Sequence, residues 1–513
     1  MTTQQSQPGS FSPKPEEKSS WLFIGLILAA ATFLFTFRLG SEGLWIDELS
    51  SIRDASAFEN PLKVYSASRI RPLYYVLLSV WMRFGSSDVW LRSLSVVFAV
   101  LSVYLIYRLG RRIAGETEGL VAAMLLAASP LFVNHAQEVR MYVLSLCMGI
   151  AGTLFLVNAL LVKRSQKPKQ KDIGGWVIFR LLAMLAVPLN ITLLLPDFIF
   201  ILLRFRKERD VLLSFAKWSV LLVLVWLPAI PPILKDADPN SAYAVDRQRY
   251  LDRPGLGNLI YPLKYWMVSP QVVYLGKPIS LFYKLFTLLV AGLLGAGLLQ
   301  KHKTPAVVWT VAWFILPLLP IIAFSWVSAQ LWEPRYVLFV SPYLFLLIAV
   351  GFTRLWKQWK IAAIIAALIY ALAMGGALAH YYNVQNRSDY RFNVESIEQN
   401  EQPGDGIVWG YEWDNPFTYY YDGSNELYWR PMFDVDTVEG IQPWLDSFPT
   451  EHQRLWLVLD DTRPIGEEFE AAINEAYTVE ETIEFEAWSK IMLLTPRDNA
   501  PSIPPRQHPL NNP

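Results

Sequence analysis

Apolar stretches of about 20 residues recur along the first 380 residues of the chain. A helix needs about 20 apolar residues to cross a hydrocarbon core of roughly 30 Å. The pattern therefore predicts a multi-pass α-helical membrane protein with about eleven transmembrane helices. The expected spans are 21–39, 89–107, 119–134, 141–162, 173–189, 191–205, 211–233, 279–299, 304–327, 334–352 and 359–379.

Composition agrees with a membrane location and excludes several other classes. Hydrophobic residues make up 53% of the chain and charged residues 18%, whereas a soluble domain carries about a quarter charged residues. The 45 basic and 45 acidic residues cancel, so neither a disordered chain nor a nucleic-acid binder is expected. Cys147 is the only cysteine, which rules out an internal disulfide and a cysteine-based metal cluster.

Basic residues set the expected orientation. Each even-numbered span is followed by a loop containing Lys or Arg, such as 108–112 and 163–171, whereas the short loops after odd-numbered spans contain almost none. Basic loops face the cytoplasm. We therefore expect a cytoplasmic N-terminus and, with an odd number of spans, an extracytoplasmic C-terminal segment in the inner or plasma membrane.

The expected division of the chain follows from these spans. The transmembrane domain covers 21–380 and carries two long outer loops, 40–88 and 235–278. The apolar run 72–84 is too short to span, so it is expected to lie flat in the interface. Residues 383–497 alternate as strands do, with helical patterning between them, and predict a small α/β extracytoplasmic domain. Composition predicts disorder for 1–20 and 498–513.

Three polar motifs border lipid on the outer face. The first is the pair Asp47-Glu48, shortly after the first span; the alternative is that Asp47 caps a helix over 48–57. The second is the insert 134–142, with Glu138, Arg140 and Tyr142; the alternative is an ordinary connection whose Arg140 extends to the head groups. Charges so close to hydrocarbon are costly, which favours a function.

The third motif is Trp332-Glu333-Pro334-Arg335-Tyr336, at the outer start of the tenth span; the alternative is an interfacial anchor. Carboxylates and arginines at the outer surface suit transfer of a sugar from a polyprenyl-phosphate donor. Such a reaction needs a base, here Asp47 or Glu138, and a cation for the departing phosphate, here Arg71, Arg140 or Arg335.

A metal cofactor stays open at this stage. Asp47, Glu138 and His135 are possible ligands of a divalent cation, but the sequence requires none. No GxxxxGK[ST] phosphate loop occurs in the chain, so ATP-driven pumping is unsupported.

The order of these motifs resembles the GT-C glycosyltransferases. Within them the chain is most similar to the family 39-like group, which includes protein mannosyltransferases and the lipid A aminoarabinose transferase. The resemblance extends over residues 20–380. It rests on Trp45-x-Asp47-Glu48, Arg71–Tyr75, Leu91–Ser95, Arg111–Gly115, Glu138-x-Arg140-x-Tyr142 and Arg335-Tyr336.

This resemblance implies an integral-membrane inverting glycosyltransferase. Asp47, with Glu48 adjacent, would be the catalytic base, and Glu138 a second carboxylate. Arg140 with Tyr142 and Arg335 with Tyr336 would bind the donor phosphate. The acceptor, whether lipid, glycan or protein, stays open, and Asn190 stands where many relatives carry a His.

Two other functions share the topology. A flippase or transporter of lipid-linked sugars would carry charges along a path through several spans, but the span interiors hold few beyond Arg180, Asp197 and Lys217. A polymerase or ligase of lipid-linked glycans differs only in its acceptor. The motif order favours the transferase.

Overall fold

The computed structural model places the chain in two compact units, which are described separately. The membrane unit comprises Met1–Leu39 and Ala55–Asn383, and the α/β unit comprises Gly40–Asp54 and Val384–Pro513. The first part of the outer loop 40–88 thus groups with the C-terminal residues. The structure describes residues 16–57, 71–163, 166–241, 244–245, 247–248, 251, 253–255, 277–299, 305–410, 415–432, 438–460, 467–485 and 489–497.

Some expectations concern residues that lie outside these ranges. They are the expected disorder of 1–15 and 498–513 and most of the outer loop 235–278. Residues 16–20, in contrast, belong to helix α1, so the expectation of disorder was wrong there. The apolar sequence that follows continues the same helix.

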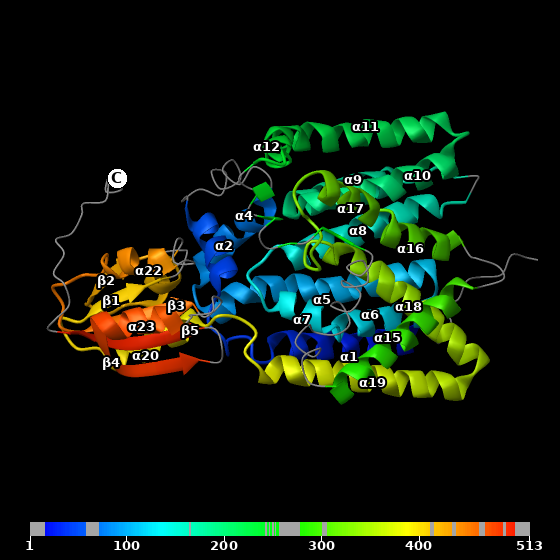
Figure 1. Cartoon of the computed structure of the whole chain (residues 1–513). Coiled ribbons are helices and arrows are strands. Elements are labelled where there is room, and N and C mark those ends of the chain that lie inside the picture. The colour runs from blue at the N-terminus through cyan, green and yellow to red at the C-terminus, as the bar shows by residue number, and fades with distance from the viewer. Residues whose placement is uncertain are drawn as a thin grey trace, which may run out of the picture. The chain divides into compact units, whose positions relative to one another are not determined.

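Helices form the membrane unit, and the long ones run side by side (Figure 1). In chain order they are α1 (Glu16–Thr36), α4 (Pro72–Trp81), α5 (Asp88–Ile113), α6 (Glu116–Ala127), α7 (Pro130–Ala136), α8 (Tyr142–Leu160), α9 (Gln170–Ala186), α10 (Leu194–Phe205), α11 (Arg209–Trp226), α12 (Ile230–Asp236), α15 (Lys277–Leu298), α16 (Pro305–Ile315), α17 (Leu318–Val327), α18 (Ser341–Gln358) and α19 (Lys360–Asn383). Short 3-10 turns are η1 (Met82–Phe84), η2 (Pro188–Leu193), η3 (Leu227–Ala229) and η5 (Leu338–Val340).

The multi-pass helical architecture is confirmed, but the count of about eleven spans is not. The described residues contain eight helices long and apolar enough to cross a membrane, or nine if α6 and α7, bent by 66°, form one span. The expected span 21–39 is represented by the shorter apolar helix Trp21–Thr36. The expected span 173–189 corresponds to α9, which has 17 residues and contains Lys171, Asp172 and Arg180.

Helix α4 corresponds to the segment that was expected to lie flat. It has 10 residues, fewer than the roughly 17 needed to cross a bilayer. Pro72 stands in its first turn, where the missing N–H costs nothing. Its orientation in the membrane stays a prediction.

Helices α15 and α18 pack backbone against backbone. A Cβ atom on Gly351 would overlap the carbonyl oxygen of Leu293, and one on Gly297 would lie 3.0 Å from the carbonyl oxygen of Leu347. Small residues permit such close helix contacts in membranes. A Cβ atom on Gly292 or Gly295 would meet no other atom within 4 Å in the described part of the chain, so these glycines take no part in the contact.

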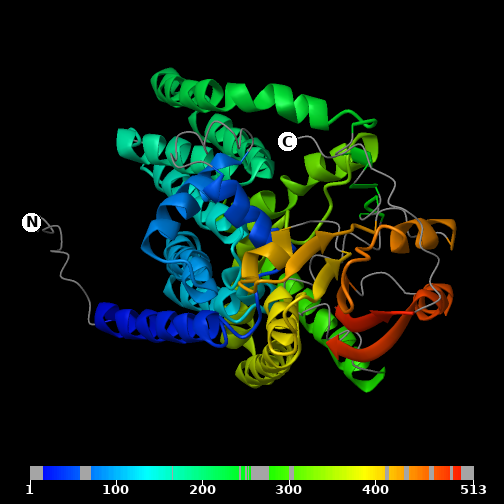
Figure 2. The same cartoon turned by 90° about the vertical axis from the view of Figure 1, so that its left-hand side faces the viewer.

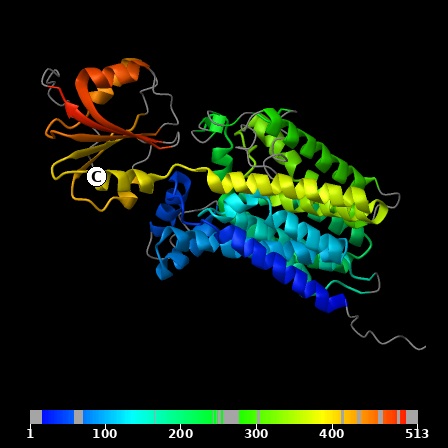
Figure 3. The ribbon, with the colours of Figure 1, turned by 90° about the horizontal axis from the view of Figure 1, so that it is seen from below.

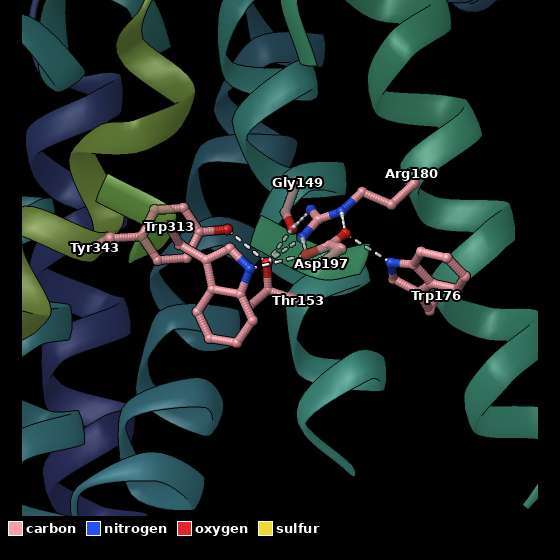
Figure 4. Close-up of polar contacts among 7 residues, drawn as sticks. All are labelled: Gly149, Thr153, Trp176, Arg180, Asp197, Trp313 and Tyr343. Carbon is pink, nitrogen blue, oxygen red and sulfur yellow. Dashed lines mark hydrogen bonds and ion pairs between the residues drawn. The ribbon is translucent and has the colours of Figure 1, made fainter. Parts of the chain in front are cut away.

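An ion pair lies in the interior of the membrane unit (Figure 4). Arg180 donates from Nε to Oδ2 of Asp197 at 2.7 Å and from Nη2 to Oδ1 at 3.1 Å. Both side chains are fully buried. A buried charge pair is tolerated only when its remaining donors and acceptors are also satisfied.

Neighbouring helices supply those further hydrogen bonds. Trp176 and Trp313 donate from Nε1 to the Asp197 carboxylate at 2.7 and 2.8 Å. Arg180 also donates to the Gly149 carbonyl and to Thr153 Oγ1, both at 2.7 Å, and Thr153 Oγ1 lies 2.5 Å from the hydroxyl of Tyr343. The network therefore ties together α8, α9, α10, α16 and α18.

The α/β unit contains a five-stranded mixed sheet, seen again in Figure 2. The strand order is β2-β1-β3-β5-β4; β1 is parallel to β2 and β3, and β5 is antiparallel to β3 and β4. The elements are α2 (Ile46–Ser56), α20 (Tyr390–Glu398), β1 (Gly406–Trp409), α21 (Asn415–Tyr420), β2 (Glu426–Trp429), α22 (Val438–Leu445), β3 (Leu455–Asp460), α23 (Glu467–Ala476), β4 (Tyr477–Phe485) and β5 (Ser489–Pro496).

Helices cover both faces of the sheet (Figure 3). Leu455, Leu457 and Leu459 of β3 alternate toward α22 and α23, where they join a core with Trp444 and Phe469. Helix α20 lies on the opposite face. The central strands β1 and β3 are buried on both faces, as their continuous apolar runs indicate, whereas β2 and β4 keep exposed residues.

Candidate functional site

The polar insert 134–142 forms a tight turn between two helices. Ser129 caps α7 by accepting a hydrogen bond from the Phe132 N–H at 3.4 Å, and α8 begins at Tyr142. In between, the Arg140 N–H donates to the Glu138 carbonyl at 2.8 Å. The side chains of the turn are buried, with Glu138 2% and Arg140 7% exposed.

Gln137 fixes this turn to two distant helices. Its Nε2 donates to the Phe35 and Phe37 carbonyls at 3.1 and 2.8 Å, at the end of α1. Its Oε1 accepts from the Tyr381 hydroxyl at 2.9 Å, on α19. The amide therefore satisfies the open carbonyls of a helix end and holds the turn in one position.

His135 and Glu138 form a buried pair in the same turn. His135 Nδ1 lies 2.5 Å from Glu138 Oε2, and both side chains are almost fully buried. The other ring nitrogen of His135, Nε2, is buried and makes no hydrogen bond within the described part of the chain. The imidazole ring also contacts Tyr142, with ring centroids 5.1 Å apart.

The third sequence motif meets the second in space. The chain turns at Pro334, where the Tyr336 N–H donates to the Glu333 carbonyl at 3.0 Å. This turn brings the Tyr336 ring to 6.2 Å from that of Tyr142. The two motifs, far apart in the sequence, therefore lie side by side.

Three guanidinium groups surround these two rings. Arg140 lies 5.7 Å from the Tyr142 ring centroid, and Arg335 and Arg247 each lie 5.4 Å from that of Tyr336. Arg247 also donates from Nη1 to the Tyr336 hydroxyl. We call Arg140, Tyr142, Arg247, Arg335 and Tyr336 the arginine–tyrosine cluster. Arginine binds phosphate oxygens in a bidentate fashion, so this concentration of positive charge suits a phosphate group.

Sequence reasoning missed Arg247. It lies in the long outer loop 235–278, which contains several other basic residues and no recognised motif. Its distance from Tyr336 along the chain is 89 residues. No local signal distinguishes it from Arg253 in the same loop.

Glu333 is the acidic member of this region. Burial raises the pKa of its carboxyl group, and the positive charges of Arg335 and Arg247 lower it only in part. Arg335 Nε lies 3.9 Å from Glu333 Oε1. The charge on Glu333 therefore sets how much positive charge the cluster retains.

Two further predicted site elements are Arg71 and the pair Asp47-Glu48. Arg71 is the exposed N-cap residue of α4, and no described interaction links it to the arginine–tyrosine cluster. Asp47 and Glu48 belong to the α/β unit. Their association with Glu138 in one site stays a prediction.

The neighbouring carboxylates of α2 differ in their surroundings. The helix begins at Ile46, and Glu48, which is fully buried, accepts from the Trp45 N–H at 3.3 Å. This contact is half of a capping box. The alternative in which Asp47 caps a helix starting at Glu48 was therefore wrong, because Glu48 has the capping contact. Asp47 is half-buried.

A metal site at Asp47, Glu138 and His135 stays a prediction as well. Within the described residues, one group of three side chains lies close enough together to share an ion. It belongs to the α/β unit and consists of Glu426, Glu451 and His452. The Tyr428 hydroxyl already lies 2.7 Å from His452 Nε2 and 2.9 Å from Glu451 Oε1. These contacts account for the grouping without an ion.

Comparison with known proteins adds the family context. Residues 72–234 match the family model described as dolichyl-phosphate-mannose-protein mannosyltransferase. No curated protein sequence matches the chain. Among solved structures, ArnT from Cupriavidus metallidurans bound to undecaprenyl phosphate is similar, with a TM-score of 0.54 and 12% identity, over 93% of this chain and 98% of that one. The resemblance to the GT-C glycosyltransferases is confirmed.

Two further solved structures have a similar fold. The apo form of the same ArnT gives a TM-score of 0.55 at 13% identity, again over 93% of this chain and 98% of that one. Arabinofuranosyltransferase AftD from Mycobacteria gives 0.51 at 12% identity, over 93% of this chain and 40% of that one. At these identities the likeness shows the fold.

Proposed function

We propose that the protein is an inverting glycosyltransferase that moves a sugar from a polyprenyl-phosphate donor to an acceptor hydroxyl at the outer face of the membrane. The arginine–tyrosine cluster is the observation that carries this proposal. It gathers the guanidinium groups of Arg140, Arg247 and Arg335 around two tyrosines. The similar ArnT structure is bound to undecaprenyl phosphate, which supports a lipid phosphate as the ligand.

The cluster would act on the leaving group. When the acceptor oxygen attacks the anomeric carbon of the donor sugar, the bond from that carbon to the phosphate oxygen breaks. Negative charge then builds up on the phosphate. Arginines fixed in advance around that phosphate stabilise the charge without further rearrangement, and polyprenyl phosphate leaves with the bonding electrons. No general acid is required.

A carboxylate would act on the acceptor. Asp47 is our candidate base, which accepts the proton of the acceptor hydroxyl as that oxygen attacks and later returns it to water. Its half-exposed position and the capping role of its neighbour Glu48 support this choice. Glu138 is buried and paired with His135, which suits a second, orienting carboxylate. A single displacement of this kind inverts the anomeric configuration.

The positive-inside pattern supports the proposed location. It favours a cytoplasmic N-terminus and an extracytoplasmic C-terminal segment. Nucleotide sugars do not reach the outer face, whereas a lipid-linked sugar is presented there. The acceptor is a hydroxyl of a lipid, glycan or protein.

Sugar transfer by the purified full-length protein tests this function. We would supply a radiolabelled mixture of polyprenyl-phosphate sugars and compare the wild type with Asp47→Asn and Glu138→Gln. Lys217→Met, an exposed change on α11, is the control. We expect transfer with inverted anomeric configuration by the wild type and the control, and loss of transfer by Asp47→Asn with donor binding retained.

Other outcomes would contradict the proposal. Full activity of both carboxylate variants would exclude the proposed base and its partner. Movement of labelled lipid across vesicles without any transfer would indicate a flippase. Extension of a lipid-linked glycan would indicate a polymerase or ligase.

A further inference from the structure

We propose that the α/β unit is a positioning element that holds the proposed base, Asp47, in place. This inference rests on the proposed function. The segment Gly40–Asp54, which we call the docking segment, clusters with residues 384–513 rather than with the helices before and after it in the chain. The C-terminal residues therefore do more than cover a site or recognise an acceptor, because they determine where Asp47 lies.

Hydrogen bonds fix the start of the docking segment. Arg391 donates from Nη2 to the Gly40 carbonyl at 3.0 Å. The backbone N–H of Asn386 donates to Glu42 Oε1 at 2.7 Å, and its side-chain Nδ2 donates to the same oxygen at 3.3 Å. A carboxylate that accepts two hydrogen bonds from one residue is held in a single orientation.

Gly43 fits against α20 with no space for a side chain. A Cβ atom there would overlap Asp389 Oδ1 and lie 2.9 Å from the Cβ of Arg391. Asp389 has little freedom to move, because its Oδ1 accepts from the Phe392 N–H at 3.0 Å as the N-cap of α20. The backbone of the docking segment therefore lies directly on the helix start.

The last contact before α2 is made by the next residue. The Leu44 N–H donates to the Tyr420 hydroxyl at 2.7 Å, and the Leu44 side chain is fully buried. Tyr420 is the last residue of α21. Asp47 follows Leu44 by only three residues, and the Trp45–Glu48 capping contact sets the conformation of those residues.

A carboxylate held in this way needs no reorganisation when the acceptor arrives. Displacement of a catalytic group by about 1 Å costs on the order of a hundredfold in rate. Tyr420 and Gly43 are therefore positioning residues, since they act through Asp47. Their substitution should lower kcat and leave binding of the lipid phosphate unchanged, because the arginine–tyrosine cluster belongs to the membrane unit.

The test uses full-length protein carrying Tyr420→Phe or Gly43→Val. Tyr420→Phe removes the hydroxyl that accepts from the Leu44 N–H and keeps the aromatic ring. The matched controls are Tyr419→Phe, at the neighbouring residue, which is 39% exposed, and Gly25→Val, where nothing lies within 4 Å of a built Cβ. Hydrogen–deuterium exchange of peptides from 40–54 and 130–145, kcat for transfer, and the Kd for undecaprenyl phosphate are measured.

We expect both positioning variants to exchange faster over 40–54 and normally over 130–145. Their kcat should fall about tenfold or more with Kd within about twofold of wild type, and both controls should match the wild type. Unchanged exchange over 40–54 would overturn the docking, whether or not the protein transfers sugar. Faster exchange with wild-type kcat would overturn the positioning role. If the wild type transfers no sugar, the proposed function fails, and the exchange data still decide the docking.

Discussion

Arg180 and Asp197 form a bidentate ion pair between α9 and α10, with N–O distances of 2.7 and 3.1 Å, in the interior of the membrane unit. Each charge depends on the other, since both side chains are fully buried. The pair also links, through Thr153 and Tyr343, the helix that follows one cluster motif to the helix that follows the other.

Removal of one partner should therefore destabilise the membrane unit strongly. Asp197→Asn or Arg180→Met leaves a buried charge uncompensated, which costs about 3–5 kcal/mol. We expect a large fall in Tm of the purified protein, with partial recovery in the double variant Arg180→Met/Asp197→Leu. Lys217→Met, the exposed control, should leave Tm unchanged. A double variant no more stable than the single ones would contradict the pairing.

Arg247 should be required for binding of the lipid phosphate. Arg247→Lys keeps the charge but loses the planar fork that binds two phosphate oxygens. Hydrogen bonds to charged groups contribute about 1.5–3 kcal/mol, so we expect the Kd for undecaprenyl phosphate to rise by about 10- to 100-fold. Arg108→Lys is a matched control, because Arg108 lies 5.6 Å from the Tyr104 ring at an exposed position. Equal affinities for both variants would exclude Arg247 from the phosphate site.

Glu333 should make stability depend on pH. Burial raises the pKa of this carboxyl group, so the folded protein binds the proton more tightly than the unfolded chain. Its contribution to stability is complete below the ordinary carboxyl pKa, and it is lost as pH rises through the raised pKa. Glu333→Gln mimics the neutral form. We expect Tm of this variant, relative to wild type, to increase as pH rises from about 4 to 8.

Glu451 provides a control of opposite sign. Hydrogen bonds from its own backbone N–H and from Tyr428 lower the pKa of its carboxyl group. Its contribution is therefore present above the ordinary pKa and lost as pH falls. Glu451→Gln should lose stability relative to wild type as pH rises. A flat difference for Glu333→Gln would show that the carboxyl group titrates normally.

Substitution of Asp47 should affect catalysis, whereas substitution of Glu48 should affect stability. Asp47→Asn should lower kcat by about 10²- to 10⁴-fold, the range for loss of a general base, with Tm unchanged. Glu48→Ala removes the acceptor of the Trp45 N–H and should cost about 0.5–2 kcal/mol of stability, as for other caps. Loss of transfer in Glu48→Gln with normal Tm would instead identify Glu48 as the base.

The sequence predicted those features that depend on local patterns. Apolar length indicated most of the membrane helices, and the alternation in 383–497 indicated the sheet. The motifs around Glu138 and Arg335 were noticed because charge next to hydrocarbon is costly. That the two motifs lie close together, with the Tyr142 and Tyr336 ring centroids 6.2 Å apart, was expected only from the family resemblance.

Features that depend on contacts between distant segments were missed. Arg180 and Asp197 were read as isolated charges, because a pairing 17 residues apart on two helices leaves no periodic signal. The docking of 40–54 was missed for the same reason. Nothing in the sequence around Gly43 indicates that Asp389 and Arg391, more than 340 residues later in the chain, leave no space for a side chain there.

The glycine contact between α15 and α18 limits how the helices of the membrane unit can move. No side chain separates the two backbones at Gly351, where even a methyl group would overlap Leu293. Side chains change rotamer to let helices slide, but two backbones in contact have no such freedom. The two helices must therefore move together, as one rigid pair.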